Sequence, residues 1–313
     1  MPAYTSDVHI DQALTTLSIA YSNDGYVADD VLPPVPVDKR TDRYFVYGQE
    51  PFKQHDDLVR PGGVAPEFNW TVSQAAYSAE RHALRSMITD DVRREADQPI
   101  NMDIDTTQML TDAVQNQREF QVLNYVTNPA NVPNNVTLSG TTQWSDYTNS
   151  TPLADLRTAK AAVRMGALRE GTHFTTNYDV ALVLADHPDL LELIKYTDPN
   201  NIANSGLPAT IRGLRTIVSS AFLDTANQGQ VADMQNAFGN NALVHYTSAT
   251  AGLKTLSFGY RFEAPDATTG VRGFATIRYR QEERHGDWIE VCTTYAMRIV
   301  APTAAYLFVA AIA

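Results

Sequence analysis

Residues 29–70 read DDVLPPVPVDKRTDRYFVYGQEPFKQHDDLVRPGGVAPEFNW, and prolines set the backbone where this stretch begins. Pro33, Pro34 and Pro36 fix their own φ angles and bias their neighbours toward extended geometry. Residues 31–37 are therefore not expected to form a helix. We expect the chain to continue from here as an extended arm that lies outside any core.

A long hairpin is expected in the second half of the stretch. Residues 43–47 are aromatic and β-prone and predict a strand, whose return partner is expected over residues 70–84. The segment between them contains the turn signal Pro61-Gly62-Gly63, and a structureless insertion of this length is unusual inside a compact domain. Its large apolar side chains argue against simple disorder. We expect an ordered arm that packs on a partner.

The overall composition is that of an ordinary globular protein, with 313 residues, 43% of them hydrophobic and 19% charged. Its apolar runs are shorter than the roughly 20 residues that cross a bilayer, and no signal peptide is apparent, so folding in the cytosol is expected. Cys292 is the only cysteine, which excludes an internal disulfide. A net charge of −12 without clustered Lys or Arg argues against nucleic-acid binding as the main activity.

Outside the hairpin, the pattern predicts a mixed α+β protein. The long helix expected over residues 103–126 is capped by Asp105 or Thr106, and its apolar face consists of Leu110, Ala113, Phe120 and Leu123. Residues 129–151 are expected to be surface loop. The other expected helices are 10–21, 152–171 (capped by Thr151), 188–196 and 208–214. The other expected strands are 179–185, 215–219, 241–246, 256–262 and a β-rich stretch 271–312 with a turn at 285–287 and a break at Pro302.

One motif resembles an enzyme signature. Residues 103–107, DIDTT, fit the D-x-D-x-T pattern of haloacid-dehalogenase phosphotransferases, in which the first carboxylate is the nucleophile and the second a general acid. That motif follows a buried hydrophobic strand, whereas here a polar segment precedes it and an amphipathic helix follows. Helix capping and the helix dipole therefore explain Asp103 and Asp105 better than catalysis does.

The other candidate chemical sites have simpler structural explanations. The densest acid and histidine cluster, Glu282, Glu283, His285 and Asp287, lies on an expected hairpin turn, where solvated side chains are expected. His82, His173 and His245 are interpreted as ordinary hydrogen-bonded histidines. Cys292 lies in a β-rich run and is expected to be a buried, inert thiol. The sequence predicts no catalytic residue, no metal site and no cofactor.

Several phrases occur in an order that resembles the major capsid proteins of tailed double-stranded DNA phages with the Hong Kong 97 phage-like fold. The likeness covers nearly the whole chain and is strongest over residues 10–127 and 287–313. The matching phrases are YVADDVLPPVPV at 26–37, RYFVY at 43–47, RPGG at 60–63, AP at 65–66, AD at 96–97, RE at 118–119 and VAPTAAY at 300–306.

This resemblance implies an α+β fold with an N-terminal arm, an extended β-hairpin loop, a long spine helix, a peripheral domain and an axial domain. The implied boundaries are residues 1–42 for the arm, 43–88 for the extended loop, 89–171 and 286–313 for the peripheral domain, and 172–285 for the axial domain. The family sometimes carries a cleaved scaffolding extension, and this sequence shows none, which implies a separate scaffolding protein.

The implied function is a structural shell subunit, not an enzyme, that assembles into hexamers and pentamers of an icosahedral phage head. Its implied partners are copies of itself, a scaffolding protein, a portal protein, a decoration protein and packaged DNA bound without sequence specificity. Its implied location is the virion capsid, assembled in the host cytoplasm, with no membrane association. Candidate inter-subunit contacts are Tyr44, Phe45, Phe52, Phe68 and Trp70 for packing, with Asp56, Asp57 and Arg60 for ion pairs.

Two alternatives remain open at this stage. A bacterial nanocompartment shell protein of the encapsulin type shares the implied fold and encloses enzyme cargo in place of DNA. The phosphotransferase suggested by Asp103 and Asp105 is a rival of another class. For the aromatic residues of the loop, an intramolecular core is the alternative to an interface.

Overall fold

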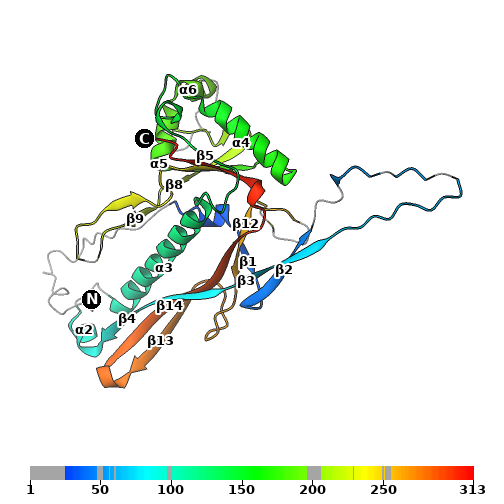
Figure 1. Cartoon of the computed structure of the whole chain (residues 1–313). Coiled ribbons are helices and arrows are strands. Elements are labelled where there is room, and N and C mark those ends of the chain that lie inside the picture. The colour runs from blue at the N-terminus through cyan, green and yellow to red at the C-terminus, as the bar shows by residue number, and fades with distance from the viewer. Residues whose placement is uncertain are drawn as a thin grey trace.

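A computed structural model describes residues 25–47, 52–55, 57–59, 61–96, 101–195, 206–227, 229–248, 250 and 255–313. The helix expected over residues 10–21 lies outside this range. The described chain forms two main sheets, a long helix beside one of them, and a hairpin whose loop projects far from the body (Figure 1). The expected α+β class is confirmed.

The first sheet is five-stranded and is organised around the long strand β14 (Gly286–Ile299). Three strands pair with β14 in antiparallel orientation: β4 (Glu80–Thr89), β12 (Gly259–Glu263) and β13 (Ala275–Gln281). The short strand β1 (Pro34–Pro36) adds to β12 in parallel. The 3-10 turn η6 (Glu282–Arg284) joins β13 to β14, which confirms the expected turn in this region.

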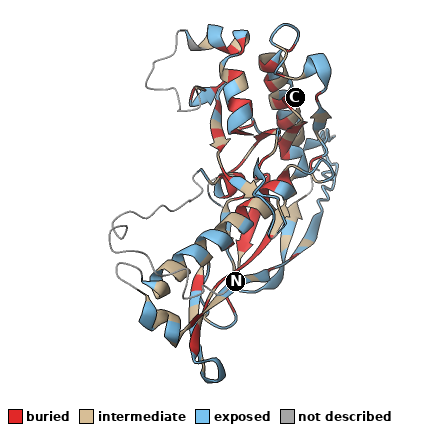
Figure 2. Ribbon diagram, turned by 90° about the vertical axis from the view of Figure 1, so that its left-hand side faces the viewer, coloured by how far each residue is buried: buried red, intermediate tan, exposed pale blue. Residues whose placement is uncertain are grey.

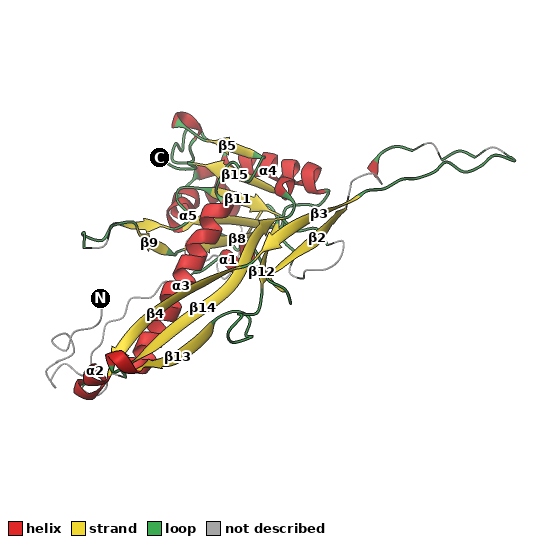
Figure 3. Cartoon of the chain, turned by 60° about the horizontal axis from the view of Figure 1, so that its bottom comes forward, coloured by secondary structure: helices red, strands yellow, loops and turns green. Residues whose placement is uncertain are grey.

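Helix α3 (Met102–Val126) lies along this sheet and contacts both β4 and β14 (Figures 1 and 3). Its 25 residues span about 37 Å at 1.5 Å per residue, which confirms the expected long helix. Its buried residues recur at helical spacing: Val114, Arg118, Glu119, Val122, Leu123 and Val126. The predicted apolar face was therefore only partly right, since Leu123 is buried but Ala113 is exposed. The helix begins at Met102, one residue before the predicted start, and its cap is Asn101, whose side chain accepts from the Ile104 amide, not the predicted Asp105 or Thr106.

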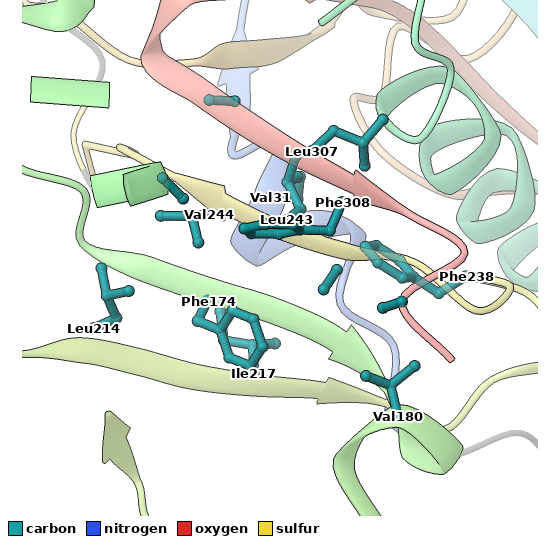
Figure 4. Close-up of a cluster of buried hydrophobic side chains, with 14 of the residues drawn as sticks. Val31, Phe174, Val180, Leu214, Ile217, Phe238, Leu243, Val244, Leu307 and Phe308 are labelled. Atoms are coloured by element: carbon teal, nitrogen blue, oxygen red, sulfur yellow. The ribbon is translucent and has the colours of Figure 1, made fainter. Parts of the chain in front are cut away.

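The segment before the hairpin belongs to the core, so the expectation that it lies outside any core was wrong. Helix α1 (Ala28–Val31) is a single turn, and Val27, Ala28, Val31 and Leu32 are all buried in the main hydrophobic cluster. Figure 4 shows Val31 among side chains of the second sheet. Burial of aliphatic side chains is the dominant gain in folding, and this segment takes part in it before the prolines extend the chain.

The second sheet is six-stranded, in the order β5-β15-β11-β6-β8-β7. Its strands are β5 (Asn135–Thr137), β6 (His173–Asn177), β7 (Thr210–Ile211), β8 (Leu214–Ser219), β11 (Ala242–His245) and β15 (Ala305–Val309). Helix α4 (Pro152–Ala167) packs on β11 and β15, and helix α5 (Tyr178–Ala185) packs on β6 and β8. Phe174, Leu243 and Phe308 lie in the core of this sheet (Figure 4).

Three sequence predictions in this region were wrong. Residues 179–185 form helix α5, not a strand, because the Asn177 side chain caps the segment by accepting from the Val180 amide. Residues 208–214 contain β7 and a turn, not a helix. Residues 129–151 are not all surface loop, since they contain β5 and the fully buried Trp144, whose indole N–H donates to Asp155.

The remaining short elements connect these parts. Helix α2 (Asp90–Glu95) follows β4, and helix α6 (Pro188–Ile194) confirms the short helix expected after Pro188. Strands β9 (Phe222–Asp224) and β10 (Met234–Asn236) form a separate hairpin. The 3-10 turns η4 (Gly140–Thr142) and η7 (Pro302–Ala304) precede α4 and β15. The break expected at Pro302 is confirmed by η7.

The sheets cut across the predicted domain boundaries, which stay a prediction. Strands β12 and β13 fall in the segment assigned to the axial domain, yet they pair with β14 beside the long helix. Strand β15 falls in the segment assigned to the peripheral domain, yet it pairs with β11 in the six-stranded sheet. Each of the two sheets therefore contains strands from both of the chain segments that the resemblance assigns to different domains.

Candidate assembly interface

The hairpin predicted from the opening stretch is confirmed. Strand β2 (Thr41–Tyr47) pairs antiparallel with β3 (Val72–Ser78), from Thr41 opposite Ser78 to Tyr47 opposite Val72. Beyond the pair, the loop continues outward and leaves the body of the molecule (Figure 3). The strands thus form a short stem that carries a long loop, and we call the described part of residues 41–78 the extended loop.

The extended loop exposes large apolar side chains. Val64 is 94% exposed and Phe52 is 72% exposed. The other exposed apolar residues of the loop are Phe45, Leu58, Val59, Phe68, Trp70 and Val72. A concentration of exposed apolar side chains on one projecting segment is typical of an interaction site. Its position on a projecting arm keeps it away from the core of its own subunit.

Contacts within the loop order some of these side chains. The rings of Tyr47 and Trp70 stack with centroids 6.2 Å apart. Nearer the tip, the rings of His55 and Phe68 meet edge to face at 5.1 Å. These two aromatic contacts hold the outgoing and the returning chain of the loop next to each other. They leave Phe68 and Trp70 substantially exposed even so.

Tyr44 differs from the other predicted contact residues, because it packs on its own subunit. Its ring lies 5.6 Å from that of Phe262 on β12, and Tyr77 of β3 stacks on the same phenylalanine at 4.5 Å. Burial raises the pKa of the Tyr44 hydroxyl. Tyr44 therefore anchors the stem to the five-stranded sheet. An additional contact of Tyr44 with another subunit stays a prediction.

The predicted ion-pair residues are only partly within view. Asp56 and Arg60 lie outside the described residues, and Asp57 is exposed. Their role between subunits stays a prediction. Two arginines fix the stem and the residues before it: the Arg298 guanidinium donates to the Ala76 carbonyl of β3, and Arg272 pairs with Asp38, which precedes β2.

Sequence reasoning missed a buried polar cluster between α3 and the start of α1. The Glu119 carboxylate on α3 accepts from the backbone amides of Val27 and Ala28, at 2.8 and 3.0 Å. Burial raises the pKa of Glu119, and these two amide hydrogen bonds act in the opposite direction. Next to it, the buried Arg261 pairs with Asp29 and with Glu263. The partners are far apart in sequence, so no local pattern could have indicated the cluster.

Two of the acidic residues considered for chemistry, Asp103 and Asp287, are paired with arginine. Asp103 pairs with Arg93 at 3.0 Å. Asp287 is buried and accepts from Arg93 and from Arg278 at 3.0 and 2.5 Å. The hydrogen bond from Arg278 lowers the pKa of Asp287. Asp287 therefore serves to hold α2 and β13 against β14.

The described residues also include those considered for metal binding and for thiol chemistry. Within the described ranges, no group of His, Cys, Asp and Glu is arranged to hold a metal ion. Cys292 is buried in β14, as expected, and burial raises the pKa of its thiol. A raised pKa leaves less of the reactive thiolate at neutral pH.

The histidine interpretation is confirmed for His245. Its ring is fully buried and makes hydrogen-bond contacts with the Thr175 and Thr247 hydroxyls, at 3.0 and 2.6 Å. His173 on β6 stacks on it with ring centroids 5.2 Å apart.

No helix in the described ranges is both long and apolar enough to cross a bilayer.

Comparison with known proteins identifies one similar chain over nearly the full length and a second over part of it. The chain is 27% identical over 314 residues to the major capsid protein of Pseudomonas phage JBD67, covering 97% of both chains. It is 25% identical over 194 residues to the major capsid protein of Burkholderia phage BcepMu, covering 60% of this chain and 61% of that one. No family model matches the sequence.

Solved structures show the same fold at lower sequence identity. A phage-related protein from Bordetella bronchiseptica RB50 superposes with a TM-score of 0.69 at 19% identity, over 96% of this chain and 97% of that one. The capsid of cyanophage P-SCSP1u gives 0.68 at 10% identity, over 97% and 93%. An encapsulin of Synechococcus elongatus PCC 7942 gives 0.58 at 11% identity, over 96% and 95%. The chain has the Hong Kong 97 phage-like capsid fold, and its resemblance to the major capsid proteins of phages is confirmed.

Proposed function

We propose that this chain is the major capsid protein of a phage and assembles with copies of itself into the shell of the head. The end-to-end similarity to one phage major capsid protein, the partial similarity to a second and the fold support this function. The observation that carries the mechanism is the extended loop, which projects from the body with Phe52 and Val64 largely exposed. The proposed role is structural, without catalysis.

In the proposed mechanism, the extended loop of each subunit lies across a neighbouring subunit. Burying a few hundred Å² of apolar surface at about 25 cal/mol per Å² supplies several kcal/mol gross for each neighbour. Each contact repeats around a closed ring, so modest contacts add up to a stable shell. Hexamers and pentamers are the proposed rings, and α3 beside β14 is the rigid bar that tilts as the shell matures.

Deletion of residues 54–63 tests this mechanism. The described residues of this segment lie in the outer part of the extended loop, carry exposed apolar side chains and include no residue of the main core. The deleted protein is expected to fold with an unchanged thermal midpoint and to form no closed shells under negative-stain electron microscopy. Normal particles from the deleted protein would contradict the proposed role of the loop.

A nanocompartment shell is the second candidate, because the encapsulin fold also matches over 96% of this chain. The two functions differ in what the shell encloses. Particles purified from cells that express the neighbouring genes are expected to contain nuclease-protected double-stranded DNA. A peroxidase or ferritin-like protein as the enclosed cargo would favour the nanocompartment.

The proposed partners follow from the capsid function. They are a separate scaffolding protein, a portal protein, a decoration protein and packaged DNA held without sequence-specific contacts, with assembly in the host cytoplasm. The phosphotransferase alternative gains no support from the geometry. Asp103 lies in the first turn of α3 and is paired with Arg93, not held at the end of a buried strand.

A further inference from the structure

A pocket of about 520 Å³ lies beside α4, and none of its described lining residues belongs to the extended loop. It is lined by the first turns of α4, by the start of α6 and by the turn between β7 and β8. Helices α4 and α6 pack against each other at this end of the molecule (Figure 1). The charged residues of its described lining are Arg157, Lys160, Arg212 and Asp189.

The lining is positively charged although the chain is acidic. Three cationic side chains face one carboxylate, which gives the described lining a net charge of +2 in a protein of net charge −12. The pocket also includes Thr151, the residue that precedes α4, and the positive end of the helix dipole lies there. The Thr151 side chain does not cap the helix. The described lining therefore carries more positive than negative side chains.

Two of the cationic residues are positioned by the fold. The Lys160 ammonium donates to the Arg212 carbonyl at 3.0 Å and lies 3.6 Å from the Glu170 carboxylate. Arg212 has a φ of +52° and Gly213 a φ of +78°, which is the left-handed backbone of a tight two-residue hairpin turn. This turn joins β7 to β8, so the sheet fixes where Arg212 meets α4. The pocket rim is held in place by these contacts.

Arg157 is the cation available for a ligand. Its side chain has no ion pair or hydrogen bond with any residue in the ranges that the structure describes, and it is exposed one turn before Lys160 on α4. A guanidinium group presents two parallel N–H donors that match the oxygens of a phosphate. Lys160 adds a second positive charge to the lining, beside the Glu170 carboxylate.

We infer that this pocket binds a phosphate group, either as free phosphate or as the backbone phosphate of a nucleic acid. This site goes beyond the proposed shell function and does not rest on it, because the extended loop contributes no residue to the described lining. The expected arrangement is a bidentate contact from Arg157, with Lys160 and Arg212 supplying the remaining positive charge.

Calorimetric titration of the unassembled full chain with inorganic phosphate tests the site, at fixed ionic strength with chloride as the reference salt. We expect saturable binding of one phosphate per chain. Arg157→Ala is expected to weaken it about tenfold, as for loss of a charge-assisted contact. Arg164→Ala is the matched control, because Arg164 is an exposed arginine on α4 outside the pocket lining. It is expected to leave binding unchanged.

A gain-of-binding variant keeps the test independent of folding defects. Asp189→Asn removes the carboxylate of the described lining and is expected to tighten phosphate binding several-fold. A short DNA duplex that competes with phosphate would identify backbone phosphate as a source, and binding without such competition would indicate a small phosphate ligand. The inference is overturned if phosphate gives no saturable binding above chloride, or if Arg157→Ala and Arg164→Ala weaken binding equally.

Discussion

Neighbouring residues on strand β2 have opposite surroundings. Tyr44 packs against Phe262, whereas Phe45 is 54% exposed. Successive side chains of a strand point to opposite faces, so one face of the stem holds it to the subunit and the other remains available. The aromatic run that predicted the strand therefore combines two roles in adjacent positions.

Alanine substitutions separate these two roles. Tyr44→Ala is expected to lower the free energy of unfolding of the isolated subunit by about 2 kcal/mol, because it removes a half-buried aromatic contact. Phe45→Ala is expected to change it by less than about 0.5 kcal/mol, as for an exposed site. Urea unfolding followed by fluorescence measures both. Equal losses of stability would contradict the assignment of Tyr44 as the anchor.

The buried His245 is expected to make the free energy of unfolding of the subunit depend on pH. Burial lowers the pKa of His245 well below its usual value, so the folded state holds it neutral where the unfolded state takes up a proton. The His173 ring stacked on it lowers that pKa further, and the Thr175 and Thr247 hydroxyls are its hydrogen-bond partners. The contribution of the neutral His245 to stability is therefore fully present above about pH 6.5 and is lost progressively as the pH falls below that value.

The predicted slope is about 1.4 kcal/mol per pH unit for this one proton, over the range of about pH 6 to 5. His245→Gln is expected to flatten the slope in that range by about this amount. His285→Gln is the control, because His285 is exposed on the turn before β14. The measurement is urea unfolding at several pH values. Identical slopes for the wild type and His245→Gln would contradict the prediction.

Among the elements, α3 connects the start of the described chain to the five-stranded sheet. It contacts β4 and β14. Its Glu119 carboxylate accepts hydrogen bonds from the backbone amides of Val27 and Ala28, where α1 begins. Figure 2 shows buried residues along the sheet beneath this helix and exposed residues on its outer side. The helix therefore holds the five-stranded sheet on one side and the α1 segment, which precedes the hairpin, at Glu119.

Substitution of Glu119 tests this connection. Glu119→Ala leaves the amides of Val27 and Ala28 buried without an acceptor, which is expected to lower the free energy of unfolding by about 3 kcal/mol. Glu119→Gln keeps one acceptor oxygen and is expected to lie between this variant and the wild type. Gln117→Ala, at an exposed position of α3, is the control. A change of less than about 0.5 kcal/mol for Glu119→Ala would contradict the anchoring role.

Sequence predicted the elements whose signals are local. The long helix was predicted because periodicity and a clear stop at Asn128-Pro129 agree, and the hairpin because prolines and turn residues flank a β-prone run. Residues 179–185 were mispredicted because a short apolar run suits a strand and a helix equally, and the cap at Asn177 decided between them. Arg212-Gly213 decided for a turn in the same way.

The candidate site was predictable only as a segment. The loop's prolines, turn residues and large apolar side chains indicated an arm that packs on a partner. Which aromatic stays within the subunit could not be predicted, because Tyr44 is covered by Phe262, more than two hundred residues later in the chain. The Glu119 cluster was missed for the same reason, since its hydrogen bonds join residues 91 and 92 positions apart.

For the whole molecule, the position of the extended loop is the feature with functional consequences. The body is held by its two sheets and main hydrophobic cluster, and the loop leaves it sideways with apolar side chains that cannot reach this cluster (Figure 3). A single subunit therefore keeps apolar surface in contact with water. In the proposed assembly, further copies cover this surface at many equivalent contacts.

Cryo-electron microscopy of assembled shells, at a resolution that traces the chain, tests this most directly. We expect the loop of each copy to lie on an adjacent copy, with Phe52, Val64 and Trp70 covered by it and Tyr44 still on Phe262 of its own subunit. Shells in which the loop folds back onto its own body, or stands free of every neighbour, would contradict the account.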